Sequence, residues 1–102
     1  MSFPKNDIII YRLERAKESL QDAKILSRNK RWNACANRLY YACYYSVIAL
    51  LLKNKFSAKT HSGVRSLFGF HFIKTEKISI EYGQLYNDLF ENRQEGDYRD
   101  FI

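Results

Sequence analysis

Hydrophobic residues recur along the chain at the spacing expected of helices. Over about residues 7–27 they stand three or four positions apart, which is the stripe of an amphipathic helix. This stripe consists of Ile9, Leu13, Ala16, Leu20 and Ala23. A second helix is predicted over about residues 32–53, and its second half, 47–52, is apolar on every side. We therefore expect the second helix to be the central and most buried one.

Capping residues and shorter stripes predict two further helices. Ser57 or Thr60 can cap a third helix that ends near Phe72. Ser79 can cap a fourth helix, and Gly96 is a natural stop for it. The apolar stripe of this fourth helix is Tyr82, Leu85, Tyr86 and Leu89, and Arg93 extends it.

Strand patterns are missing from the sequence, since no run of strand length alternates hydrophobic and polar residues. The sequence therefore predicts an all-α fold, an antiparallel up-and-down helical bundle of four to five helices joined by short loops. Residues 1–102 form a single domain in this interpretation, because a chain of this length has room for one modest core. A fifth helix, if the bundle has one, would follow the C-terminus of this chain.

Charge narrows the classes of partner. The chain carries 17 Lys and Arg against 11 Asp and Glu, a formal net charge of +6. This balance favours a nucleic acid or another polyanion as partner, and it equally fits a charge that serves solubility alone. The longest apolar run, 40–52, is shorter than the ~20 residues of a membrane span. We expect a cytoplasmic protein without a membrane partner.

The two cysteines and two histidines predict neither a disulfide nor a metal site. Cys35 and Cys43 lie in one predicted helix, about 12 Å apart along its axis, which is too far for a disulfide. They fit small buried side chains in a reducing compartment. The histidines are not clustered with cysteines, so no zinc-binding spacing is present. No metal and no cofactor is predicted.

The stretch "NRLYYACYYSV", from Asn37 to Val47, places polar groups in a helix that should be buried. Arg38, Tyr41 and Tyr45 share one helical face, and a neighbouring stripe also carries phenols. These phenols belong to Tyr40 and Tyr44. A buried arginine must be paired or must serve a ligand. Two interpretations stay open: a packed core in which an acid pairs with the arginine, or a phosphate-binding face.

The acids available for such a pair are Glu91, Glu95 and Asp97, near the end of the fourth helix. His61 stands where the third helix begins, and there the helix dipole lowers the pKa of an imidazole. On its own, His61 fits a capping or surface histidine better than a functional one. His71, in "FGFHF", fits a packed or half-exposed histidine.

Three segments together resemble a known family. "ANRLYYACYYSVIALLL", "KTHSGVRSLFGFHFIKT" and "LYNDLFENRQEGDY" are similar to the HEPN superfamily (higher eukaryotes and prokaryotes nucleotide-binding). The branch they resemble is a small prokaryotic one with the pattern Arg-x-Tyr-Tyr-Ala, then Lys-x-His-x-Gly-Val, then Arg-x-x-x-Asp-Tyr. The resemblance covers about residues 10–98, nearly the whole chain.

The resemblance implies a helical bundle that commonly forms homodimers. Members often accompany a minimal nucleotidyltransferase in toxin–antitoxin or defence modules. Many are metal-independent ribonucleases in which an arginine is followed, after four to six residues, by a histidine. The arginine would hold a phosphate and the histidine would move a proton. Carried over to this chain, the nucleotide- or RNA-binding residues are Asn37, Arg38, Tyr41 and Arg93.

The sequence departs from that pattern at the histidine. No histidine falls four to six residues beyond Arg38, and the next position holds Tyr45. A tyrosine, with a pKa of about 10, is a poor general base at neutral pH, and its use could lower the rate by about 10²–10⁴. The catalytic candidates are therefore Arg38, Tyr45 and His61. His61 would supply the imidazole if the third helix packs its start against Tyr45.

Two functions follow from these residues. The first is a HEPN-type toxin that binds RNA or a nucleotide and cuts RNA without metal. The alternative is a non-catalytic dimerisation and interaction module that works with a nucleotidyltransferase partner. In some HEPN toxins such a partner adds nucleotidyl groups to a tyrosine just after the motif, and Tyr44 or Tyr45 is the matching modification site here.

Overall fold

The computed structural model describes residues 4–99, with side chains described up to residue 93. The described residues form four α-helices and one π-helical turn, and they contain no strand. The elements are α1 (Lys5–Arg28), α2 (Trp32–Lys53), α3 (His61–Phe68), η1 (Gly69–Ile73) and α4 (Ile80–Arg99). The all-α prediction is confirmed.

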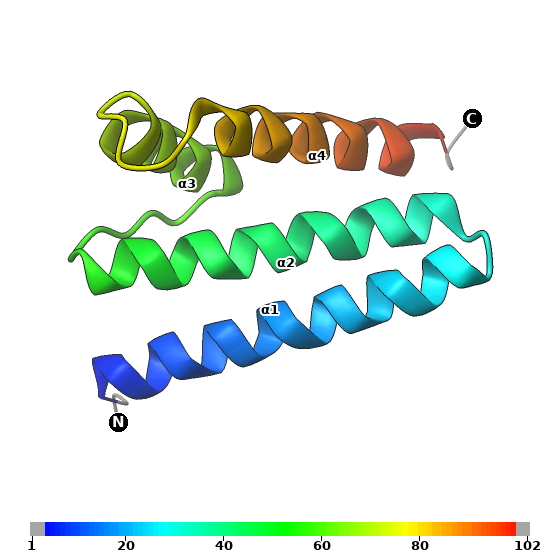
Figure 1. Ribbon diagram of the computed structural model, residues 1–102, viewed down its shortest axis with the longest axis horizontal. Helices are drawn as coiled ribbons and strands as arrows, with labels where there is room; N and C mark the ends of the chain where they lie inside the picture. Colours follow the sequence, from blue (N-terminus) through cyan, green and yellow to red (C-terminus); the bar gives the residue numbers. More distant parts are fainter. Residues whose placement is uncertain (1–3, 100–102) are drawn as a thin grey trace.

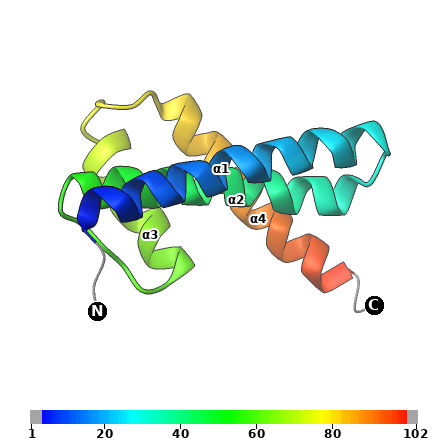
Figure 2. The same ribbon diagram turned by 90° about the horizontal axis from the view of Figure 1, so that it is seen from below.

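The second helix, α2, lies at the centre of the molecule. In Figure 1, α1 runs antiparallel to α2 along its length, and α4 lies on the opposite side of α2. Figure 2 shows that α4 crosses α2 obliquely, while α1 and α2 run nearly parallel to a common axis. The short α3 contacts both α2 and α4, and η1 contacts α4. The antiparallel bundle around a central second helix agrees with the sequence pattern.

Small side chains bring α1 close to α2. Ala16, Ser19 and Ala23 are the buried residues of α1, and α2 is the only element that α1 contacts in the described part of the chain. The Cys35 thiol of α2 is also buried and donates to the carbonyl oxygen of Ala23 at 3.3 Å. A seam of small residues allows the two helix backbones to approach closely over many turns.

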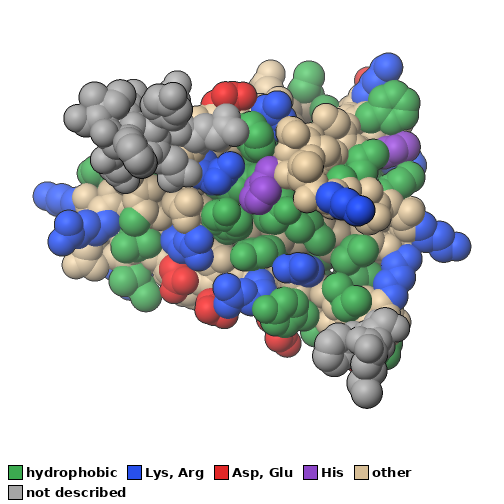
Figure 3. Space-filling model, turned by 180° about the vertical axis from the view of Figure 1, so that it is seen from behind, with side chains coloured by type: hydrophobic (Ala, Val, Ile, Leu, Met, Phe, Trp, Pro, Cys, Tyr) green, Lys and Arg blue, Asp and Glu red, His purple; other side chains and the backbone are tan. Residues whose placement is uncertain are grey.

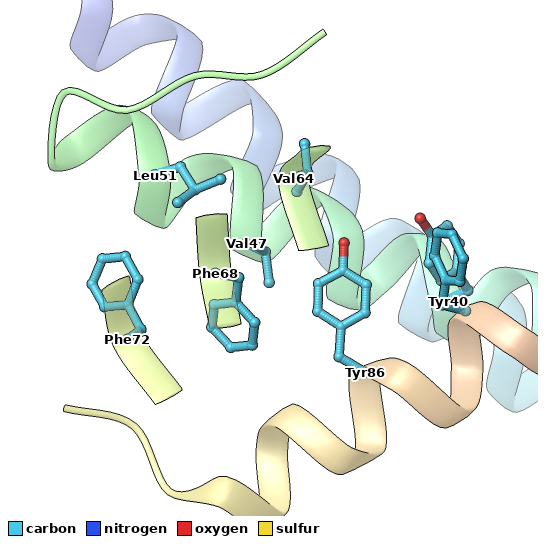
Figure 4. Packing of buried hydrophobic residues seen from close by; sticks show 8 residues of the cluster. Tyr40, Val47, Leu51, Val64, Phe68, Phe72 and Tyr86 are labelled. Atoms are coloured by element: carbon cyan, nitrogen blue, oxygen red, sulfur yellow. The ribbon is translucent and has the colours of Figure 1, made fainter. Parts of the chain in front are cut away.

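The main hydrophobic core lies on the other side of α2, away from α1. It combines residues of α2, the α3–η1 segment and α4 (Figure 4). Its buried members are Tyr40, Val47, Leu51, Val64, Phe68, Phe72, Tyr86 and Phe90. Because α3 and η1 supply three of these side chains, they hold α4 onto α2 although they are short.

Two predicted caps are present and one predicted stop is wrong. The Thr60 hydroxyl oxygen accepts the Gly63 N–H at 3.0 Å at the start of α3, and the Ser79 hydroxyl oxygen accepts the Glu81 N–H at 3.4 Å. α4 does not stop at Gly96 but continues to Arg99. Glycine ends a helix only where the chain turns into a left-handed conformation. Inside a helix it costs only about 1 kcal/mol relative to alanine.

The predicted apolar stripes of α1 and α4 are only partly buried. Leu20, Tyr82 and Leu85 keep exposed fractions of 41%, 62% and 49%. All three line an apolar groove of about 690 Å³ that runs over α2 between α1 and α4. The stripes stay partly open because α1 and α4 each pack on α2 without contacting one another.

Replacing Leu51 by alanine tests the position of this core. Leu51 is 1% exposed within the cluster, so Leu51→Ala should lower the free energy of unfolding by about 2–5 kcal/mol in urea denaturation. Leu85→Ala is the matched control, since Leu85 is 49% exposed, and it should cost well under half as much. Equal losses for the two variants would contradict this description of the core.

Candidate functional site

Tyr40 joins three helices at the centre of the candidate site. Its side chain is fully buried, and its ring lies 5.9 Å from the rings of both Tyr86 and Phe90 of α4. Its hydroxyl oxygen lies 2.7 Å from Nδ1 of His61, the first residue of α3. The guanidinium carbon of Arg93 lies 4.8 Å from the centre of the Tyr40 ring. Groups from α2, α3 and α4 therefore meet around one phenol.

His61 packs against the neighbouring tyrosine stripe of α2. Its ring stacks on Tyr44, with ring centres 4.2 Å apart and planes 4° from parallel, and it meets the edge of Tyr41 at 5.9 Å. The sequence hypothesis placed the start of α3 against Tyr45, whereas the structure places it against Tyr40 and Tyr44. Residues four apart share a helical face, and Tyr45 is turned about 100° away from Tyr44 around the helix.

The environment of His61 favours its neutral form. Burial lowers the pKa of His61 below its ordinary value of 6.5, and the positive charge of Arg93 lowers the pKa further. Burial also raises the pKa of Tyr40 to about 12. At neutral pH a protonated phenol therefore faces a neutral imidazole.

A polar pocket of about 550 Å³ opens between the start of α2 and α4. Its polar lining consists of Arg31, Asn33, Asn37, Arg38, Asn92 and Arg93. Trp32 also lines the pocket and is 61% exposed. Guanidinium and amide groups together offer many N–H donors, and guanidinium groups bind phosphate oxygens in pairs.

Arg38 has amide and aromatic partners. Its Nε and Nη2 donate to Oδ1 of Asn37 at 3.2 and 2.8 Å, and its guanidinium carbon lies 5.1 Å from the centre of the Tyr41 ring. The predicted pairing with Glu91 is wrong, because Glu91 accepts from Arg65 at 3.1 Å. No described acid forms an ion pair with Arg38. The side chains of residues 95 and 97, the other predicted partners, lie outside the described residues.

Shared neighbours connect the pocket to the histidine. Arg93 lines the pocket and also covers Tyr40, whose hydroxyl contacts His61. Tyr41 lies between the guanidinium of Arg38 and the His61 ring. Figure 3 shows one face of the molecule, where Lys and Arg side chains surround a hydrophobic centre that includes a histidine.

The structure thus gathers most of the candidates predicted from sequence. Asn37, Arg38 and Arg93 line one pocket, and Tyr41 and His61 lie beside it. Tyr45 lies next to α1 instead, with the guanidinium carbons of Arg12 and Arg15 5.9 and 5.8 Å from its ring centre.

Sequence reasoning missed the part that Tyr40 plays at this site. Its only sequence signal is the spacing of four residues between Tyr40 and Tyr44, which marks a face able to receive a ring from another helix. That signal does not say which ring packs there, since His61 is 21 residues away from Tyr40 in sequence.

The donors in this region are suited to anions. Among the described residues, no group of three or more His, Cys, Asp or Glu side chains is placed to hold a metal ion. The absence of a cofactor stays a prediction. Within the same part of the chain, no helix combines the length and hydrophobicity needed to cross a membrane.

Comparison with known families identifies the chain. The HEPN domain family matches residues 10–102. The chain belongs to the HEPN family. The resemblance seen in the three sequence segments is therefore confirmed, and the helical bundle is the fold of that family.

Several relatives of this HEPN chain have been named. A UPF0332 protein of Thermotoga maritima is 46% identical over 98 residues, which cover 96% of this chain and 74% of that protein. Two proteins of Methanocaldococcus jannaschii, named "Putative toxin MJ0142" and "Putative toxin MJ0605", are 35% and 37% identical over 86 residues. Those matches cover 84% of this chain but only 58% and 64% of the two proteins. No solved structure matches the chain.

The environment of His61 predicts how the HEPN chain responds to pH. Above its ordinary pKa of 6.5 the ring is neutral in both the folded and the unfolded chain, so it adds no pH dependence. As the pH falls below 6.5, His61 takes up a proton in the unfolded chain before it does so in the folded chain. The free energy of unfolding therefore decreases between pH 6.5 and the lower pKa of His61 in the folded chain.

Titration of the His61 ring by NMR should therefore give a midpoint below 6.5. Arg93→Gln should raise this midpoint, because it removes a nearby positive charge, whereas Arg93→Lys should preserve it. A wild-type midpoint above 6.5, or identical midpoints for the two variants, would contradict the described environment.

Proposed function

We propose that this HEPN chain is a toxin-type protein that binds RNA in the pocket of Arg38 and Arg93 and cuts it without a metal ion. The observation that carries the proposal is the position of His61. No histidine stands at the expected place in α2, but α3 brings Nδ1 of His61 within 2.7 Å of the Tyr40 hydroxyl oxygen. Arg93 lies beside this pair. A phosphate-binding group and a neutral imidazole are thus available on one face.

The pocket supplies the groups that would bind the phosphate. Asn37 orients the guanidinium of Arg38 through two hydrogen bonds, and Arg93 lines the same pocket from α4. A phosphodiester gains negative charge on its free oxygens as a nucleophile attacks. Two guanidinium groups fixed in advance would stabilise that charge without a metal ion.

His61 would move the proton. When its Nδ1 donates to the Tyr40 oxygen, Nε2 keeps its lone pair, which is the form that a general base requires. Nε2 removes the proton of a ribose 2′-hydroxyl, and the 2′-oxygen bonds to the adjacent phosphorus. The bond from phosphorus to the 5′-oxygen of the next nucleotide breaks, and the proton passes to that oxygen. The products are a 2′,3′-cyclic phosphate and a free 5′-hydroxyl.

His61 is a better base than Tyr45, the other candidate for proton transfer. A lowered imidazole pKa leaves the base form of His61 populated at neutral pH, whereas the Tyr45 ring lies against Arg12 and Arg15 of α1. In this proposal, Tyr45 takes no part in proton transfer.

A toxin role fits the relatives named as putative toxins. The proposal also includes two kinds of partner. We propose that the chain forms a homodimer and works with a minimal nucleotidyltransferase that silences it by modifying Tyr44 or Tyr45. His61 covers one face of the Tyr44 ring at 4.2 Å. A nucleotidyl group on Tyr44 would therefore displace or block the imidazole.

A non-catalytic module is the second candidate function. The observation that favours it is that no histidine, tyrosine or acid stands among the described residues that line the arginine–asparagine pocket. In this case the chain holds RNA or a nucleotide, or serves as a dimerisation module beside the nucleotidyltransferase. The two candidates differ in one property, the cleavage of RNA.

Incubation of purified protein with RNA in the presence of a chelator separates the two functions. Wild type should cleave, and Arg38→Ala and His61→Ala should each slow cleavage by about 10²–10⁴. Lys24→Ala, on the exposed surface of α1, is the control for loss of one positive charge. Absence of cleavage by wild type would favour the module, and full activity of His61→Ala would remove the imidazole from the mechanism.

Two conservative variants test the positioning by Tyr40. Tyr40→Phe keeps the ring and removes the hydroxyl that contacts Nδ1, so cleavage should slow about tenfold, the effect of one hydrogen bond worth about 1.4 kcal/mol. Tyr44→Phe removes a phenol from the same stripe but keeps the ring under His61, and it should have a smaller effect. Equal effects on kcat would contradict the role of the Tyr40 hydroxyl.

A further inference from the structure

Two arginines of α1 lie against a tyrosine ring of α2. The guanidinium carbons of Arg12 and Arg15 are 5.9 and 5.8 Å from the centre of the Tyr45 ring. Arg12 is also 5.7 Å from the ring of Tyr11, which is 54% exposed. α1 thus adds cations and an exposed aromatic surface that the pocket at Arg38 does not use.

This cluster is continuous with the pocket. The Arg38 guanidinium lies 5.1 Å from the Tyr41 ring, and the Tyr41 ring lies 5.7 Å from the Tyr45 ring. The three residues occupy positions i, i+3 and i+7 of α2, so they follow one face for about 10 Å. A cation, two rings and two further cations therefore stand in sequence along the surface.

The two arginines remain available to an anion. Arg15 pairs with Glu18 at 3.0 Å, but the pair is exposed and such pairs contribute little. The Tyr45 hydroxyl and then Glu18 raise the pKa of Arg15, so its charge is permanent. No described acid forms an ion pair with Arg12.

A row of guanidinium groups and aromatic rings matches the chemistry of a single strand of RNA. Guanidinium groups pair with backbone phosphates, and aromatic rings stack on bases whose faces are not covered by neighbouring bases. We propose that Arg12, Arg15 and Tyr45 form a second binding site, which holds nucleotides of single-stranded RNA next to the phosphate bound by Arg38. This inference rests on the proposed RNA-binding function and adds α1 to it.

The test measures the binding of an RNA that cannot be cut. A 2′-O-methylated single strand of about twelve nucleotides is titrated into the protein at several salt concentrations. The double variant Arg12→Gln with Arg15→Gln is compared with Lys17→Gln with Lys24→Gln, which removes two charges from exposed positions of α1. The single variant Arg15→Gln, at a side chain that is 35% exposed, provides the same comparison if the double variant unfolds.

Replacing the two arginines should weaken RNA binding about tenfold more than replacing the two lysines. It should also reduce the slope of log K against log salt by about 1.4, since each lost phosphate contact on a single strand contributes about 0.7. Tyr45→Ala should weaken single-strand binding by about tenfold, through loss of a stacked base.

Each opposite result is informative. If wild type binds the strand but the arginine and lysine variants bind equally well, the second site is wrong while RNA binding at Arg38 stands. If wild type does not bind it at all, both proposals fail. If the arginine variant changes only the oligomeric state in sedimentation, this face joins two copies of the chain and the inference is overturned.

Discussion

The hydrogen bond between Tyr40 and His61 is the interaction on which the site depends. Tyr40 is fully buried, and a buried hydroxyl without a partner costs about 1–3 kcal/mol. The imidazole at the start of α3 satisfies that hydroxyl at 2.7 Å, and the rings of Tyr86 and Phe90 hold the phenol from α4. The same contacts that stabilise the packing of three helices therefore fix the position of the His61 ring, to which we assign proton transfer in the proposed function.

The distribution of charge then determines what this site can bind. Arg38 is oriented by the amide of Asn37 rather than by a carboxylate. Glu91, one of the acids predicted to pair with Arg38, forms an ion pair with Arg65 instead. Positive charge is thus left available at the pocket, where Arg93 adds a second guanidinium and also lowers the pKa of His61. One cation from α4 accordingly lines the pocket and also favours the neutral form of the neighbouring imidazole.

The sequence predicted the helices well because their signals are local. The end of α2 at Lys53 follows from its apolar run, and the Thr60 and Ser79 caps follow from hydroxyls at helix starts. The prediction from sequence failed where the burial of a side chain depends on contacts between helices. Leu20 and Leu85 lie on good apolar stripes, yet α1 and α4 each pack on α2 without meeting. The candidate arginine, asparagine and histidine could be named from sequence and family resemblance, but the docking of His61 on Tyr44 rather than Tyr45 depends on the packing of α3 against α2.

The most direct test of this account is the titration of the His61 ring with and without a bound nucleotide. A nucleoside 3′-monophosphate placed in the Arg38–Arg93 pocket brings negative charge close to the imidazole, which stabilises the protonated ring. The account predicts that the nucleotide raises the pKa of His61 from its lowered value, and that Arg38→Ala abolishes the change. An identical His61 titration with saturating nucleotide would contradict it, because the phosphate site and the imidazole would then be separate.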